Sequence, residues 1–458
     1  MNFRKRLFIP VLLVFVLFVG ISTVNAGEDE NLIPEVEYSH FTLDNGLEIY
    51  VFEDHQVPLA EVSLWYNVGS IDEPAGLTGI SHFVEHATFL GTETLEEGEI
   101  PELVKSVGGS NNASTDYWRT RYYETVPASS LELAVALEAD RMQNMMLLHE
   151  EFEREKEVIL QERRRRIEND AYESGLVKIK EEAFKDTPLE HHVVGWREDL
   201  RNINLIDLYK YYKKYYVPNN AILSVAGDVD PEEVYELAQK YFADYERGEI
   251  PERDFTFPEQ EEERVVRVRE VTEVPYVIML YKLPPGDHPD VVAVDFLLDI
   301  LVNRSTSRVN EELRQKQQIL LGAWGMNAQL PGPGYSQVVL VPNSEQSVEK
   351  AVRGYEEELG KIVENGVSRE EIKAVKRDLT KSLILSQRNI VDFSSEVISS
   401  HLKYGEPEFY QTRIERLEEI TEEDIIRVAR KYFKQEKRTT GYILPKKEEN
   451  NLMDNMLR

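Results

Sequence analysis

Residues 203–223 read INLIDLYKYYKKYYVPNNAIL and residues 420–440 read ITEEDIIRVARKYFKQEKRTT, so one pattern occurs twice in the chain. Each stretch contains a helical segment that ends in paired aromatic residues, then a short polar gap, then a β-prone segment. Tyr215 and Tyr432, the first residue of each aromatic pair, are 217 residues apart. The pattern indicates a duplicated unit of helix and strand, with a chance match of a common pattern as the alternative.

The repeat divides the chain into two similar halves. A chain of 458 residues is too long for one compact core, so two globular domains are the default expectation. Residues 246–263 lie between the copies, are charged, contain two prolines and lack apolar periodicity, which is typical of a linker. We therefore expect domains at residues 36–245 and 264–445, followed by a polar tail at residues 446–458.

Strands and helices are both expected within the first domain. Asp44-Asn45-Gly46 separates two β-prone segments, which is the pattern of a tight β-hairpin. Apolar residues then recur at helical spacing over residues 77–90, 131–145 and 150–169. The sequence predicts an α+β fold of two similar, duplicated domains, each a mixed, mainly antiparallel sheet packed with helices.

The N-terminus has the features of an export signal. Three basic residues at positions 4–6 precede an apolar run over residues 7–19, and residues 24–26, Val-Asn-Ala, are typical of a cleavage site. We expect residues 1–26 to be a cleaved signal peptide and the protein to be extracytoplasmic, either periplasmic or secreted. A retained membrane anchor is the alternative, but the run is shorter than the about 20 apolar residues that span a bilayer.

The mature chain is strongly acidic and contains no cysteine. Loss of the signal peptide changes the formal charge from −31 to −34, which disfavours nucleic acid and anionic membranes as partners. We expect no nucleic-acid partner and no stable membrane insertion after cleavage. The acidity is interpreted as a source of solubility, with attraction of basic peptides as the alternative. Any metal ligand must be histidine or carboxylate.

The segment Ser81–His86 carries a metal-binding pattern on a predicted helix. A step of 100° per residue places His82, Glu85 and His86 together, opposite an apolar stripe. Two imidazoles four residues apart can bind one zinc ion, and a carboxylate just before the second can reach a metal-bound water. H-x-x-E-H is thus a chemically complete fragment, with a solvated polar face that contains two histidines as the alternative.

A second predicted helix supplies the further ligand that a zinc site needs. The same arithmetic places Glu155 and Glu162 on an apolar stripe with Phe152, Val158 and Ile159, so both carboxylates are expected to be buried. Burial of a carboxylate without a cation or hydrogen bonds is costly, and zinc is a suitable partner. A solvated, glutamate-rich helix paired with the following arginines is the alternative.

These residues resemble the pitrilysin or insulinase family of zinc metallopeptidases, the inverzincins, and its two-domain subgroup that includes the mitochondrial processing peptidases. The resemblance rests on four features: His82-Phe83-Val84-Glu85-His86, the segment Glu155–Glu162, the segment Gly108–Thr115 and the pair of similar domains. It therefore covers nearly the whole mature chain.

The resemblance implies a role for each residue of the pattern. His82, His86 and Glu162 would bind one Zn²⁺ per chain. Glu85 would be the general base and proton shuttle, and Glu155 a carboxylate that orients the site. These implied roles agree with the chemistry of the residues themselves.

The resemblance also implies that Asn112 and Ala113 lie on an edge strand that pairs with the substrate backbone. Strand addition recognises extended chains with little regard to sequence. A plain turn and strand is the alternative. The adjacent His191 and His192 would point to opposite faces of a strand, so they cannot readily share a metal. The remaining histidines are expected to be structural: His40, His55, His149, His288 and His401.

The second domain is expected to be non-catalytic, because no H-x-x-E-H occurs after residue 264. In the family, this half often contributes an arginine and, seven residues later, a tyrosine that help to hold the substrate carbonyl. Arg314 resembles that arginine, but the seventh position after it is Leu321, which cannot donate a hydrogen bond. This difference from the family pattern suggests that a second subunit completes the site, so we expect a homodimer, or a heterodimer with a related non-catalytic subunit.

The sequence therefore predicts an exported zinc metalloendopeptidase that hydrolyses peptide bonds in extended or unfolded polypeptides, with Glu85 activating a zinc-bound water. The alternative is a catalytically weak family member that acts as a binding or assembly subunit of a peptidase complex. A zinc hydrolase acting on other substrates is a third interpretation, which the motif permits and only the resemblance discounts.

Overall fold

The computed structural model describes residues 37–253, 256–386 and 388–446. The predicted signal peptide, residues 1–26, lies outside these ranges, as do residues 447–458 of the predicted tail. Within the described ranges, no helix is both long enough and apolar enough to cross a lipid bilayer.

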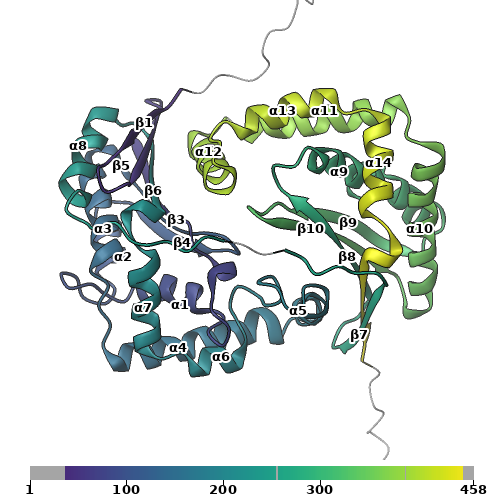
Figure 1. Cartoon of the computed structure of the whole chain (residues 1–458), viewed down its shortest axis with the longest axis horizontal. Coiled ribbons are helices and arrows are strands. Elements are labelled where there is room, and N and C mark those ends of the chain that lie inside the picture. Colours follow the sequence, from purple (N-terminus) through teal and green to yellow (C-terminus); the bar gives the residue numbers. More distant parts are fainter. Residues whose placement is uncertain (1–36, 254–255, 387, 447–458) are drawn as a thin grey trace, which may run out of the picture. The chain divides into compact units, whose positions relative to one another are not determined.

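The first half of the chain forms a six-stranded mixed sheet (Figure 1). Its order is β1-β2-β6-β3-β5-β4, and all neighbours are antiparallel except the pair β2 and β6. The expected hairpin is confirmed, because β1 and β2 pair around the Asp44-Asn45-Gly46 turn. The strands are β1 (Ser39–Thr42), β2 (Glu48–Glu53), β3 (Leu59–Tyr66), β4 (Ser110–Thr115), β5 (Thr120–Pro127) and β6 (Ala221–Gly227).

The second half forms a five-stranded mixed sheet with the order β7-β11-β8-β10-β9. This order repeats the β2-β6-β3-β5-β4 part of the first sheet, with the parallel pair in the same place. The expected α+β fold of two similar units is therefore confirmed. The strands are β7 (Arg264–Glu270), β8 (Tyr276–Pro285), β9 (Leu320–Ala328), β10 (Pro333–Pro342) and β11 (Arg438–Pro445).

The two copies of the sequence repeat occupy equivalent places. The first copy is α7 (Leu205–Tyr215) followed by β6, and the second is α14 (Glu422–Tyr432) followed by β11. Side chains of Asn204 and Thr421 cap the two helices by accepting backbone N–H groups. Strands β6 and β11 each lie between one parallel and one antiparallel neighbour.

The three helices expected in the first half are present, with adjusted ends. The helix expected over 77–90 is shorter, because Gly79 has a left-handed φ of 89° that places the helix start after it. The other two are α3 and α4, and a π-helical turn at Arg164–Glu168 continues α4. The helices besides α7 and α14 are α1 (Ile80–Ala87), α2 (Glu99–Ser106), α3 (Leu131–Gln143), α4 (His149–Arg163), α5 (Ala171–Ala183), α6 (Arg197–Asn202), α8 (Pro231–Phe242), α9 (Asp290–Leu298), α10 (Val348–Asn365), α11 (Arg369–Ser386), α12 (Ile390–Tyr404) and α13 (Phe409–Glu419).

Each sheet packs against helices on both faces. Helices α1, α3 and α8 cover one face of the first sheet, and α12 packs on β2 and β6 from the other. In the second sheet, α9, α10 and α14 cover one face and α5 packs on β7 and β11. Glycine permits this last contact, since a Cβ at Gly441 would lie 2.1 Å from Cδ1 of Ile179.

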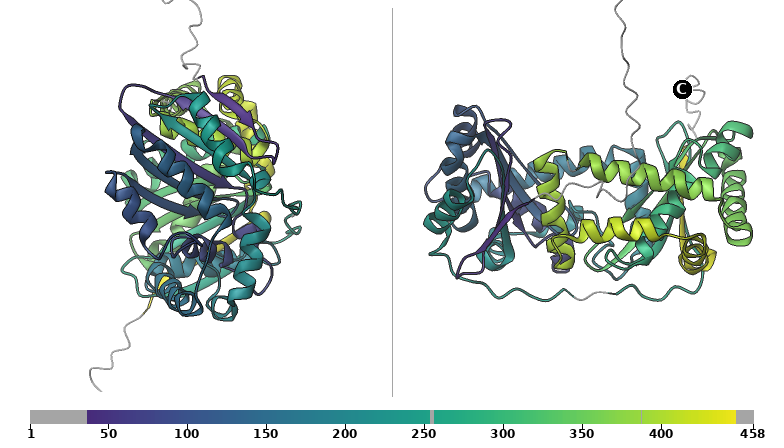
Figure 2. Two further views of the ribbon diagram at one scale, coloured as in Figure 1. Left: turned by 90° about the vertical axis from the view of Figure 1, so that its left-hand side faces the viewer. Right: turned by 90° about the horizontal axis from the view of Figure 1, so that it is seen from above.

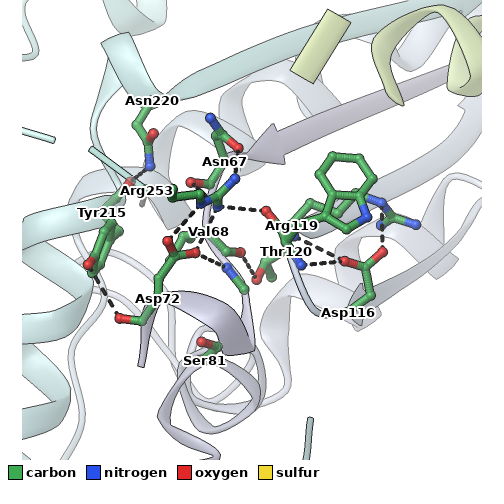
Figure 3. A network of polar contacts seen from close by, with 12 residues as sticks. Asn67, Val68, Asp72, Ser81, Asp116, Arg119, Thr120, Tyr215, Asn220 and Arg253 are labelled. Atoms are coloured by element: carbon green, nitrogen blue, oxygen red, sulfur yellow. Dashed lines mark hydrogen bonds and ion pairs between the residues drawn. The ribbon is translucent and has the colours of Figure 1, made fainter. Parts of the chain in front are cut away.

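The described parts of the predicted linker, residues 246–253 and 256–263, contain no helix or strand and run as an extended segment (Figure 2). Arg253 fixes this segment to the turn that follows β3 and to the loop between β4 and β5 (Figure 3). Its guanidinium donates to both carboxylate oxygens of Asp72 at 2.7 Å, to the side chain and backbone of Asn67, and to the backbone carbonyl of Trp118 at 2.7 Å.

Candidate active site

Helix α1 is held at its start by a buried carboxylate and by close backbone packing. Glu73 accepts hydrogen bonds from the backbone N–H groups of Gly79 at 2.7 Å and Ser81 at 2.9 Å. A Cβ at Gly79 would lie 2.3 Å from the carbonyl oxygen of Val194, so only glycine fits there. The helix that carries the H-x-x-E-H pattern therefore has a fixed start.

The metal-binding pattern lies on a buried part of α1. His82 is 6% exposed and Glu85 is 9% exposed, so this side of the helix is not a solvated surface. Helix α4 lies beside α1, and the rings of Phe83 and Phe152 stack with centroids 5.0 Å apart. This packing brings the polar groups of the two helices together.

Three side chains converge between α1 and α4. Nε2 of His86 lies 3.3 Å from Oε2 of Glu162, and Nε2 of His82 lies 3.8 Å from the same oxygen. One ligand atom from each of these residues lies within 4.8 Å of the others, and among the described residues this is the one group of three or more such side chains with that geometry. Nδ1 of His86 forms a 2.7 Å hydrogen bond with Glu155.

These distances and charges fit a zinc ion. Ligands about 2.0 Å from a tetrahedral ion lie roughly 3.3 Å apart, which matches the separations between the two imidazoles and Glu162. Burial lowers the pKa of His82 to about 3, so this imidazole is neutral and able to bind a metal. A hydrogen bond from His86, against the effect of burial, lowers the pKa of Glu162 to about 2. Burial acts in the opposite direction, but hydrogen bonds with Glu155 and Glu162 raise the pKa of His86 to about 9, so this imidazole must release a proton when it binds a metal.

Glu85 lies beside this group and is oriented by β4. Its Oε2 accepts a 2.5 Å hydrogen bond from the hydroxyl of Thr115. Burial raises the pKa of Glu85 above its usual range, which brings this carboxylate nearer to the pKa that suits a general base near neutral pH.

A pocket of about 1180 Å³ opens over these residues. Strand β4, which includes Asn112 and Ala113, forms part of its wall and is an edge strand of the first sheet. Its free edge can therefore pair with an extended peptide. The other lining residues are His82, Glu85, His86, Ser114, Thr115, Asp116, Tyr117, Val158, Gln161, Glu162, Arg164, Arg165, Arg166, Asn169, His192, Val193 and Val194.

One detail of the predicted α4 stripe is wrong. Val158 is 44% exposed and lines the pocket, because α4 turns this side toward the pocket and not into the core. Glu155 and Glu162 are only partly buried, with 13% and 10% of their side chains exposed. Arg314 of the second half does not line the pocket, and its side chain is exposed.

Sequence reasoning also missed residues of the pocket wall. His192 lines the pocket, although its position next to His191 gave no reason to assign it a role. The run of arginines at 164–166 also lines the pocket, on the π-helical turn after α4. The arginine run was visible in the sequence, but only the fold brings it to the pocket.

Two protein-family models match this chain. The family model for insulinase, peptidase family M16, matches residues 49–196, which include both helices of the site. The model for the peptidase M16 inactive domain matches residues 202–379. The chain belongs to the insulinase family of peptidases. In this insulinase-family chain, the match to the inactive-domain model ends at residue 379, within α11.

Relatives of this insulinase-family chain include proteins named as zinc proteases. Zinc protease PqqE of Helicobacter pylori is 28% identical over 414 residues, which is 89% of this chain and 93% of that protein. A crystal structure of a protease from Helicobacter pylori, 28% identical, has a TM-score of 0.84 and covers 89% of this chain and 100% of that one. Bovine cytochrome b-c1 complex subunit 1 is 34% identical over 213 residues, 46% of this chain and 43% of that protein.

Proposed function

We propose that this chain is a zinc-dependent endopeptidase that cleaves peptide bonds in extended or unfolded polypeptides. The convergence of His82, His86 and Glu162 on one point, with Glu85 beside them, carries the proposal. These three side chains would hold one Zn²⁺ per chain, and a fourth position would remain for water or substrate.

Zinc, when bound, lowers the pKa of a coordinated water to about 7 and polarises the peptide carbonyl. Glu85 accepts a proton from the attacking water while the water oxygen bonds to the carbonyl carbon and the C=O π pair moves to oxygen. Glu85 then delivers the proton to the amide nitrogen as the C–N bond breaks. The 2.5 Å bond from Thr115 holds the Glu85 carboxylate in position for both transfers.

Substrate recognition is assigned to the free edge of β4. An extended peptide that adds to this edge at Asn112 and Ala113 runs along the same pocket that contains Glu85 and the metal ligands. Main-chain pairing requires an extended substrate, so folded proteins are poor substrates. Glu155, bonded to Nδ1 of His86, is assigned the role of orienting this imidazole.

The test uses the chain beginning at Gly27, purified and analysed for zinc. We expect about one zinc per chain and cleavage of a reduced, carboxymethylated protein, with cleavage abolished by a chelator and restored by zinc. The same protein in its native, disulfide-bonded form should be cleaved far more slowly. A chain that takes up no zinc, or that cleaves neither form when loaded with zinc, contradicts the proposal.

A catalytically weak subunit of a peptidase complex is the second candidate. It is favoured by Leu321, which offers no hydrogen-bond donor, and by Arg314, which does not line the pocket. We propose that a second subunit, either another copy or a related non-catalytic chain, assists the site. A monomer with full specific activity at every dilution would contradict this assembly.

We also propose that the protein is exported from the cytoplasm. The basic residues, apolar run and Val-Asn-Ala sequence within residues 1–26 support secretion into the periplasm or medium.

A further inference from the structure

A hydrogen-bond donor to the carbonyl oxygen speeds peptide hydrolysis, because this oxygen gains negative charge as water adds to the carbonyl carbon. A single donor that is fixed before reaction contributes about 10²–10³ in kcat. Neither Arg314 nor Leu321 of the second half lines the pocket. The donor is therefore sought among the residues of the pocket wall.

The arginines of the wall are poorly suited to this role. Arg166 is 60% exposed and is paired with Oε1 of Glu162 at 2.8 Å. Arg164 and Arg165 are exposed. Exposed guanidinium groups on long side chains are solvated and mobile, so they are not fixed before reaction.

His192 has a defined tautomer. The backbone N–H of Val194 donates to Nδ1 of His192 at 3.1 Å, so Nδ1 carries the lone pair and Nε2 carries the proton of the neutral ring. Within the described residues, the bond from Val194 to Nδ1 is the hydrogen bond of the His192 ring, and none occupies Nε2. His192 therefore has one free N–H donor on the ring edge opposite Val194, and its side chain lines the pocket.

The ring stays neutral near physiological pH. Burial, together with the nearby positive charges of Lys180, Arg163 and Arg166 and the neighbouring His191, lowers the pKa of His192 to about 4. A neutral imidazole donates a hydrogen bond without releasing its proton, which suits a stabilising group and not a general acid.

The segment that carries His192 is fixed to both helices of the site. The backbone N–H of Trp196 donates to the hydroxyl of Thr78 at 2.9 Å, just before α1. Nε of Arg163, at the end of α4, donates to the carbonyl of Gly195 at 2.8 Å. Gly195 itself has φ 81°, and a Cβ there would lie 2.2 Å from the carbonyl oxygen of Thr78. His192 is thus held in place before any substrate binds.

We infer that His192 is a catalytic residue that donates a hydrogen bond from Nε2 to the carbonyl oxygen of the scissile peptide bond as negative charge develops on it. The inference rests on the proposed function. It assigns to this chain a donor from the first half, within the same pocket as the metal ligands and Glu85.

The first test determines the tautomer without any activity. Two-bond ¹H–¹⁵N correlation spectra of the metal-free full chain, with the His192 signals assigned by comparison with His192→Gln, should show protonated Nε2 and bare Nδ1 at pH 7. A proton on Nδ1, or a doubly protonated ring, would overturn the inference.

The second test compares His192→Phe, which keeps the ring volume but has no donor, with His192→Gln, whose amide can donate from a similar position. We expect His192→Phe to lower kcat about 10²–10³-fold with little change in KM, and His192→Gln to recover at least about tenfold of this loss. Both should retain wild-type zinc content. A phosphinic peptide, which mimics the charged transition state, should bind more weakly to His192→Phe than to His192→Gln. Binding of a product peptide should not weaken in either variant.

The exposed His149 provides the matched control, because His149→Phe should leave kcat, KM and zinc unchanged. Wild-type kcat in His192→Phe, or a loss of zinc that accounts for the whole defect, would overturn the inference. If the wild-type chain itself neither binds zinc nor cleaves peptides, the proposed function fails, and the spectrum still decides the tautomer on which the inference depends.

Discussion

The hydroxyl of Thr115 donates a 2.5 Å hydrogen bond to Oε2 of Glu85. Thr115 is the last residue of β4, the edge strand of the first sheet, whereas Glu85 is near the end of α1. The bond joins the strand assigned to substrate binding directly to the carboxylate assigned as general base. A peptide that pairs with β4 is therefore held in register with Glu85, which links substrate position to proton transfer.

Glu85→Gln should retain zinc, because the metal ligands remain. Its kcat should fall at least about 100-fold, because the general base is removed. The amide oxygen can still accept from Thr115, so the local structure should be preserved. Zinc content and peptide hydrolysis are measured on one preparation. Glu157→Gln, at an exposed position of α4, is the control. Near wild-type turnover in Glu85→Gln would refute its role.

Glu162→Ala should strip zinc or weaken its binding severely, because it removes one of three protein ligands. Glu155→Ala should have the smaller effect, a loss of about 10–100-fold in zinc affinity or activity, since Glu155 contacts Nδ1 of His86 and not the convergence point. Competition with a chelator measures both affinities. The reverse order would mean that the assignment of the two carboxylates is wrong.

Asp290 should stabilise the second half at neutral pH and less in acid. Its carboxylate accepts hydrogen bonds from Lys431 at 2.9 Å, from Tyr432 at 2.6 Å and from Arg427. These three bonds join α9 to α14. Burial acts against the charge, but these bonds lower the pKa of Asp290 below its usual range. A lowered folded-state pKa gives stability that is present above the unfolded-state pKa of about 3.9 and is lost as pH falls through the folded value.

The variant Asp290→Asn tests this. The free energy of unfolding should fall by about 2 kcal/mol or more at pH 7, and the difference from wild type should shrink below about pH 4. Urea unfolding across pH measures it, with the exposed Asp287→Asn as control. A difference that is independent of pH down to the acid-unfolding limit would contradict the ionic role.

Arg253→Ala should destabilise the first half, because it leaves the Asp72 carboxylate, 7% exposed, without its cation. The loss should be about 3 kcal/mol. Arg253→Lys should recover only part of it, since a single ammonium cannot reproduce the paired bonds to Asp72. Arg247→Ala, an exposed arginine of the same linker, should change stability by less than about 0.5 kcal/mol. Equal effects of the two alanine variants would refute the anchoring role.

The mature protein should begin near Gly27 and be found outside the cytoplasm, because residues 1–26 have the basic, apolar and small-residue pattern that is typical of an export signal. Sequencing the N-terminus of protein from the extracytoplasmic fraction checks this. Soluble protein with an intact Met1 would show that the signal is not cleaved.

Local sequence determined much of the fold of this protein and one half of its candidate metal site. The Asp44-Asn45-Gly46 turn predicts the β1–β2 hairpin, because its backbone conformation needs a residue that tolerates positive φ, and Gly46 has φ 88°. Helical spacing places His82, Glu85 and His86 on one side of a helix, since the step of 100° per residue is a property of the backbone alone. The repeat at 217 residues predicts two similar units, because the same local pattern folds into the same helix and strand.

Only the tertiary structure decided which distant residues share the pocket. Periodicity describes one helix at a time, so it could not show that α4 turns Val158 toward the pocket, or that Thr115 reaches Glu85 across 30 positions of the sequence. The sequence predicts no role for His192, because it adjoins His191 and adjacent side chains of a strand point to opposite faces. Its position at the pocket depends on long-range contacts of Gly195 and Trp196 with α1 and α4, which sequence spacing does not contain.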